Sequence, residues 1–210
     1  MTHHPALTIS RTLGSLGTEV GFLAARQLGW HFCDRRILRL AAEALGQPVA
    51  SLAHQEEHAC GFLEQLSRIF AFGSPESPYT PALDMPIYGR DLYELERKLI
   101  LRMVEHAPSV IVGRGGFIAL KGRPDTLHVR IKADRPFRIK ALLDKHQAAT
   151  PEAAARAIDA SDRNRSAFLR EITGLDWMDT TPFQLVLDTS RDGVDGCVRQ
   201  LVEAVRHQNG

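Results

Sequence analysis

The chain has 210 residues, which fits one compact domain or one core that carries an insertion. It is 44% hydrophobic and 24% charged, which excludes a disordered protein, and its net charge of +1 favours neither nucleic acid nor a membrane surface as a partner. No apolar run could span a bilayer, and the N-terminus is too polar to open a signal peptide, so we expect a cytoplasmic protein. The three cysteines are scattered, as expected of small buried hydrophobic residues rather than disulfides.

The first predicted elements are those of a parallel, helix-covered sheet. A strand over 6–10 is followed by a glycine turn at 14–17 and by a helix over about 18–28 with one apolar stripe. A second strand near 30–32 leads to Asp34, a suitable N-cap for a helix through residue 45. This order of strand, turn, helix and strand is typical of α/β folds.

The middle of the chain, residues 49–106, is predicted to be a helical insertion. It reads as helix to about residue 72, then as a loop with three prolines between 75 and 81, then as a strong helix over 91–106. The segments 1–48 and 107–210 then form the core of the fold.

The rest of the chain supplies three more strands, at 109–112, 126–131 and 184–188. Helices are predicted from Asp134 to 146, from Thr150 to about 172, and over 194–205, with Asp134 and Thr150 as N-caps. We therefore expect a five-stranded parallel sheet with helices on both faces. The strand at 126–131 alternates apolar and polar residues, which does not fit burial on both faces.

Three features indicate phosphate chemistry, and the first is the turn after the opening strand. Gly14 and Gly17 free backbone N–H groups to face an anion at the positive end of the next helix. A tight turn needs such glycines even without a ligand. The Walker pattern G-x-x-x-x-G-K-[ST] is absent, because the first lysine of the chain is Lys98.

The other two features are arginines where strands and helices would face a ligand. Arg114 follows the strand at 109–112 within a glycine turn, where a bidentate phosphate contact is useful, although it could equally be a surface arginine. Asp162 and Arg165 interrupt the apolar stripe of the helix that starts at Thr150, so they either pair with each other or face a polar cleft. Arg163 belongs to a basic ridge on a neighbouring face, which alone is typical of a solvated surface.

A competing pattern lies in the insertion. His54, Glu57 and His58 match the H-x-x-E-H pattern of inverted zinc peptidases. The segment is short and polar and no third ligand follows, so a solvated helix face is favoured and no metal site is predicted. A zinc hydrolase remains the third alternative.

Taken together, these motifs resemble the cytidylate-kinase-like branch of the P-loop nucleoside monophosphate kinases. The resemblance rests on the opening strand with its glycine loop at 14–21, the second strand ending at Asp34, the Gly-Arg turn at Arg114, the run 162–165 and the last strand at 185–190. It implies a P-loop NTPase-like three-layer fold with a lid region at about 135–172 and the insertion as the acceptor-binding subdomain.

The activity that the resemblance implies is ATP- and Mg²⁺-dependent phosphorylation of a pyrimidine nucleoside monophosphate, CMP or dCMP. Its partners are nucleotides, and a homodimer is compatible with it. The implied roles are catalysis by Arg114, Arg163 and Arg165, phosphate binding by Arg11, Gly14, Ser15, Gly17 and Thr18, and acceptor binding by Asp34, Arg90, Asp162 and Arg165.

The glycine loop departs from that of cytidylate kinases proper. Gly17 and Glu19 stand where those enzymes carry lysine and threonine, and Gly115 stands where an aspartate usually follows the Gly-Arg turn. We expect Arg11 to bring a guanidinium into the gap. The alternative is a nucleotide-binding or regulatory protein of the same fold that has lost catalysis together with the lysine.

Overall fold

A computed structural model of the chain describes residues 4–34, 90–113 and 115–209. The expectations for residues 35–89, including the helix after Asp34, the proline-rich loop and the H-x-x-E-H pattern, lie outside the described residues. The side chain of Arg90 and the whole of Arg114 lie outside them as well.

The described residues form one five-stranded parallel sheet, as predicted. The strands are β1 (Ala6–Arg11), β2 (His31–Cys33), β3 (Ser109–Val112), β4 (Thr126–Lys132) and β5 (Leu185–Asp188), in the order β2-β3-β1-β4-β5. All four pairings between neighbouring strands are parallel. The carboxyl ends of the strands therefore meet at one edge of the sheet, which we call the carboxyl edge.

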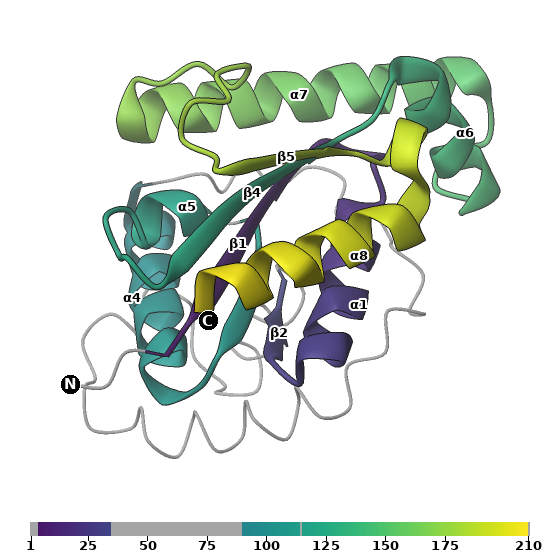
Figure 1. Cartoon of the computed structure of the whole chain (residues 1–210). Helices are drawn as coiled ribbons and strands as arrows, with labels where there is room; N and C mark the ends of the chain where they lie inside the picture. The colour runs from purple at the N-terminus through teal and green to yellow at the C-terminus, as the bar shows by residue number, and fades with distance from the viewer. Residues whose placement is uncertain (1–3, 35–89, 114, 210) are drawn as a thin grey trace, which may run out of the picture.

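Helices cover both faces of this sheet (Figure 1). Helices α1 (Gly17–Leu28) and α8 (Thr189–Asn209) lie on one side, and α4 (Arg90–His106) and α5 (Gly116–Ala119) lie on the other. Helices α6 (Arg135–Asp144) and α7 (Pro151–Thr173) pack against each other. Helix α5 was not predicted from the sequence. Within α8, Gly193 has a non-helical backbone, so the regular helix begins after it, as predicted for a helix starting at residue 194.

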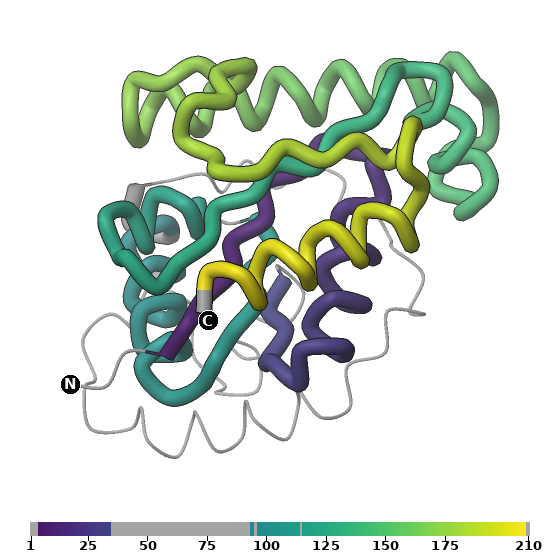
Figure 2. The backbone as a smooth tube through the Cα atoms, viewed as in Figure 1, coloured from purple at the N-terminus to yellow at the C-terminus, as the bar shows by residue number. Residues whose placement is uncertain are grey.

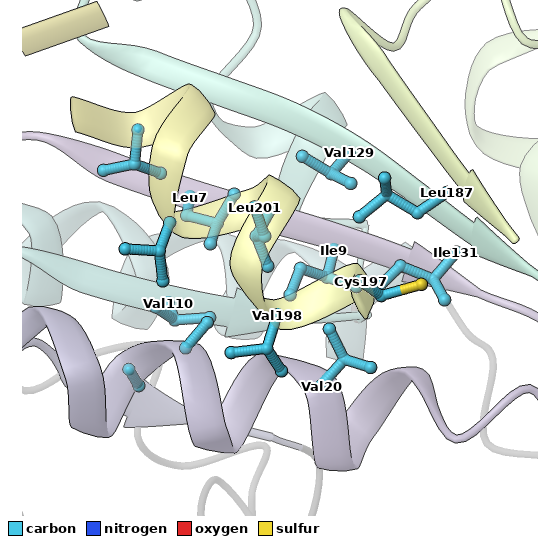
Figure 3. Packing of buried hydrophobic residues seen from close by; sticks show 14 of the residues in the cluster. Leu7, Ile9, Val20, Val110, Val129, Ile131, Leu187, Cys197, Val198 and Leu201 are labelled. Carbon is cyan, nitrogen blue, oxygen red and sulfur yellow. The ribbon is translucent and has the colours of Figure 1, made fainter. Parts of the chain in front are cut away.

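The larger hydrophobic core lies between the sheet and helices α1 and α8 (Figure 3). The apolar residues of β1 and β4 that face this side alternate along each strand, as period-two side-chain geometry requires. They are Leu7, Ile9, Leu127, Val129 and Ile131, and they belong to one cluster with Leu201 of α8.

The opposite face of the sheet explains the alternation in β4. Every residue from Thr126 to Ile131 is buried, and two of the polar side chains, His128 and Arg130, have hydrogen-bond partners. His128 shares a 2.7 Å hydrogen bond with the hydroxyl of Thr8, and burial lowers its pKa below 6.5. The Arg130 guanidinium donates to the carbonyl of Trp177 at 2.5 Å. Polar residues in β4 therefore mark a second buried layer rather than a solvent face.

The two predicted N-caps are confirmed. The Asp134 carboxylate accepts from the backbone N–H of Phe137 at 2.8 Å, and the Thr150 hydroxyl accepts from that of Ala153 at 3.2 Å. Between α6 and α7, a small apolar cluster also takes in Leu13 from the loop after β1. Packing therefore connects that loop to α6 and α7.

Cys33 and Cys197 are buried free thiols, as expected, and Cys60 lies outside the described residues. Across residues 4–34, 90–113 and 115–209, no helix is long and apolar enough to cross a membrane.

Candidate functional site

The chain between β1 and α1 makes a tight turn at the carboxyl edge and presents the start of α1. Leu16 is the N-cap residue, with a left-handed φ of 55°, and no side chain caps this helix end. The first N–H groups of a helix have no partner within the helix, and they carry its positive partial charge. The turn therefore has the backbone arrangement that an anion stabilises.

The predicted loop residues differ in what they can offer to an anion. Ser15 is fully buried, and its hydroxyl donates to the carbonyl of Thr12 at 2.8 Å. The side chain of Ser15 is thus used within the loop and does not face outward. Thr18 is half-buried and is the second residue of α1, so its N–H belongs to the uncapped helix end.

Arg11 crosses the glycine loop. A Cβ atom at Gly17 would lie only 2.7 Å from the Arg11 Cβ, and one at Gly113, whose φ is 78°, would overlap the Arg11 guanidinium. Both glycines therefore make room for this side chain. Arg11 runs over Gly17, which stands where a lysine is expected, and reaches Gly113 in the turn after β3.

Glu19, in the first turn of α1, has a cationic partner. The Nζ atom of Lys145, at the C-terminal end of α6, lies 2.5 Å from its carboxylate, and both side chains are more than a third exposed. Lys145 offsets the negative charge that Glu19 brings to the loop. The end of α6 therefore lies beside the start of α1.

Arg138 joins the loop to α7. Its Nε donates to the Leu13 carbonyl at 2.7 Å, and its Nη2 lies 2.9 Å from both carboxylate oxygens of Asp162. The Arg138 side chain is 10% exposed and that of Asp162 is 31% exposed. The internal Asp162–Arg165 ion pair considered from the sequence is therefore wrong, because the aspartate pairs with a residue of α6.

Arg165 is half-buried near Trp177 and Arg130. It donates to the hydroxyl of Ser161, and its guanidinium carbon is 5.9 Å from the ring centroid of Trp177. The guanidinium of Arg130 stacks closer, at 4.3 Å from the same ring. Burial lowers the pKa of Arg130, Asp162 acts against this shift, and the like charge of Arg165 adds to it. Asp162 and Arg165 are thus both close enough to act on Arg130.

The structure shows less about the remaining predicted site residues. Asp34 is buried at the end of β2, and Arg163 is exposed on α7. Arg90 begins α4, but its side chain lies outside the described residues, as does Arg114. Within the described ranges, no three histidine, cysteine or acidic side chains gather as a metal site.

Sequence reasoning missed four residues of this edge: Arg130, Arg138, Lys145 and Trp177. Arg138 could have been singled out from the sequence, because it lies one helical turn after the predicted N-cap Asp134. The partner of Arg130, in contrast, lies 47 positions away in the segment that returns from α7 to β5 (Figure 2).

Comparisons with known proteins show the family and the fold of the chain. The family model described as the cytidylate kinase-like family matches residues 6–191. An uncharacterized protein from Eubacterium ventriosum ATCC 27560 has a similar structure, with a TM-score of 0.69, 14% identity and coverage of 97% of this chain and 99% of that one. No curated protein matches the chain.

Two kinases of known type also share the fold. Shikimate kinase from Bacteroides thetaiotaomicron has a TM-score of 0.52 at 14% identity, with 96% of this chain and 98% of that one covered. A gluconokinase from Sinorhizobium meliloti 1021 has a TM-score of 0.50 at 10% identity, with both chains fully covered. Identities this low show the fold alone, and they confirm the predicted α/β fold with a five-stranded parallel sheet and helices on both faces.

Proposed function

The chain belongs to the cytidylate kinase-like family, and from that premise we propose that it transfers the γ-phosphoryl group of ATP to CMP or dCMP. The observation that carries this proposal is the meeting of an uncapped helix N-terminus with arginines from distant segments at the carboxyl edge. Phosphoryl transfer needs mainly positioning and charge neutralisation, which such a site supplies.

The donor phosphates would lie on the loop from Gly14 to Thr18. The N–H groups at the start of α1 and the guanidinium of Arg11 supply hydrogen-bond donors and positive charge there. Arg11 supports donor binding without a loop lysine, because its side chain occupies the space that Gly17 leaves open. Lys145 supports it further by pairing with Glu19, which would otherwise repel a triphosphate.

The acceptor would lie between the end of β2 and α7. Asp34 and Asp162 provide carboxylates for the sugar or base, and Arg165 provides a guanidinium. The family resemblance adds Arg90 to the acceptor contacts, Arg114 as the bridge between the two phosphates, and Arg163 as the arginine that closes over the donor. These assignments are proposals, and substitutions test them one at a time.

Among the described residues, no group of three histidine, cysteine or acidic side chains offers a site for the magnesium ion expected with ATP. Carboxylate oxygens suit Mg²⁺, but the Glu19 carboxylate already has an ammonium group 2.5 Å away. We therefore propose Mg²⁺ as the companion of ATP, held through the phosphates, and assign no residue as its ligand.

The absence of a loop lysine favours a second candidate, a nucleotide-binding protein without turnover. A coupled assay with ATP, Mg²⁺ and CMP, dCMP or UMP separates the two. If the protein is a kinase, Arg165→Ala and Arg114→Ala each lower kcat/KM by about 100-fold or more, since each removes charge at the transferring group. Arg170→Ala, at an exposed arginine of the same helix, leaves the rate unchanged.

Thermal unfolding detects nucleotide binding in a protein without turnover. A nucleotide that binds the folded state raises the melting temperature, by mass action, whether or not it reacts. A rise without turnover identifies the second candidate. No rise with either ATP or CMP at millimolar concentration contradicts both.

A further inference from the structure

Arg130 is a buried cation with little to neutralise it. The residue is 3% exposed in the middle of β4, next to Ser10 of β1 and Val186 of β5. A guanidinium carries five N–H donors, yet among the described residues this one makes a single hydrogen bond, to the Trp177 carbonyl. No carboxylate of the described residues lies within ion-pair distance of it.

The nearby Asp162 does not neutralise the charge of Arg130. Asp162 is close enough to act on Arg130, but its two oxygens are both bound by Arg138. Arg165 adds a second positive charge beside the same tryptophan ring. Stacking on Trp177 supplies some cation–π attraction, which does not offset the desolvation of a whole charge.

The chain could have avoided this cost, because an apolar residue at position 130 would suit a buried strand as well as its neighbours Val129 and Ile131 do. A buried charge without an oppositely charged partner destabilises the folded state. A dianionic ligand would offset it and would use the remaining N–H donors. The place of Arg130 on the face toward α5, beside Arg165, fixes where that ligand sits.

We propose that Arg130 forms the floor of the acceptor phosphate site and binds the phosphate monoester of the acceptor nucleotide, with Arg165 as the second guanidinium beside Trp177. This inference rests on the proposed function for the identity of the acceptor. It assigns the phosphate to the strand β4 and leaves the base and sugar to the residues of β2 and α7. Trp177 holds the guanidinium in place through its carbonyl and its ring.

The test is calorimetric titration of the full chain with CMP and with cytidine, which lacks the phosphate. Arg130→Met is expected to weaken CMP binding by about 30-fold or more, the size typical of a lost buried charge contact, and to leave cytidine binding within about 3-fold. Arg130→Gln is the second variant, because its amide retains a donor for the Trp177 carbonyl if the methionine variant does not fold.

Arg123→Met is the matched control. Arg123 precedes β4 at the opposite end of the strand and pairs with Asp125 at 2.9 Å. It is expected to lose stability without loss of CMP affinity. A purely structural Arg130 would give the same result as this control, or would lose CMP and cytidine binding equally, and either outcome overturns the inference.

Inorganic phosphate separates this inference from the proposed function. We expect phosphate to raise the melting temperature of the wild-type protein but not that of Arg130→Met. If the wild type binds no nucleotide and still shows this difference, the kinase proposal fails and the anion site stands. If the wild type binds CMP and Arg130→Met binds it equally well, the anion site fails and the kinase proposal stands.

Discussion

Two buried hydroxyls, Tyr93 on α4 and Thr8 on β1, differ in whether they have a hydrogen-bond partner. Tyr93 is 4% exposed, its hydroxyl has no hydrogen-bond partner among the described residues, and burial raises its pKa to about 12. The hydroxyl of Thr8, also buried, shares a hydrogen bond with His128. Stability should therefore respond differently when each hydroxyl is removed.

Tyr93→Phe is expected to leave the free energy of unfolding unchanged or to raise it by about 1 kcal/mol, because it removes a buried polar atom that has no partner. Thr8→Val is the control, since it removes a partnered hydroxyl and should cost about 1 kcal/mol or more. Urea unfolding measures both. A loss of more than about 1 kcal/mol in Tyr93→Phe would show that its hydroxyl has a partner.

His128 makes stability depend on pH. Its folded-state pKa is lowered from 6.5, so between that lowered pKa and 6.5 the unfolded chain binds more protons than the folded one. This contribution is complete above pH 6.5 and is lost as the pH falls through the folded-state pKa. We expect His128→Gln to flatten the fall in unfolding free energy on acidification, and the exposed His207→Gln to leave it as in the wild type.

Some residues of the candidate site could be predicted from the sequence, and others could not. Gly17 and Arg11 could be singled out because a glycine loop and a missing lysine are visible in a local pattern. Arg130 could not, because an alternating strand is typical of a half-exposed sheet. Only tertiary contact with Trp177 shows that Arg130 is buried.

Among the elements, α6 and α7 are joined to the glycine loop by the side chain of Arg138, in addition to the packing of Leu13. Arg138→Met breaks the bonds to Leu13 and Asp162 together, and we expect it to lower the unfolding free energy by about 2 kcal/mol. The figure lies below that of a fully buried pair because Asp162 is 31% exposed. A double-mutant cycle with Asp162→Asn should show a coupling energy, and strict additivity would contradict the pairing.

The start of α1 offers a second test. Gly17→Ala places a methyl group 2.7 Å from the Arg11 Cβ and should displace that side chain from the loop, so we expect ATP binding to weaken by about 10-fold or more. Gly29→Ala is the control, because Gly29 caps the other end of α1 with no atom within 4 Å of an added Cβ. It should cost about 1 kcal/mol of stability through its positive φ and leave ATP affinity intact.

The elements themselves were largely predictable from local signals. The N-caps Asp134 and Thr150 begin α6 and α7 as expected, and the glycine turn gives way to α1 within one residue of the predicted start. Helix α5 was missed because four residues carry no readable period. The order of the strands in the sheet is set by packing between distant segments and is not contained in any local pattern.

For the whole molecule, two buried cysteines allow unfolding to be followed on each side of the sheet. Cys197, a residue of α8, lies in the core between the sheet and helices α1 and α8, and Cys33 lies in the cluster with α4 and α5. Burial raises the pKa of the Cys197 thiol to about 11, so the reactive thiolate is scarce as well as inaccessible.

In a Cys60→Ser background, we expect neither thiol to react with a disulfide reagent under native conditions, and both to become reactive at the same urea concentration. Simultaneous labelling is expected if the two layers unfold as one cooperative unit. Earlier labelling of Cys33 would show that α4 and α5 open separately from the larger core.

The position of Arg138 has a consequence for how two substrates would influence each other. The Arg138 guanidinium donates to the backbone carbonyl of Leu13, in the loop proposed for the donor, and to the carboxylate of Asp162, which is proposed to contact the acceptor. Leu13 also packs against α6 and α7. Binding of either nucleotide would thus restrict the site of the other, so the affinities for the two nucleotides become linked by equal amounts in both directions. Such coupling between the two substrates would follow from a shared side chain rather than from a separate regulatory domain.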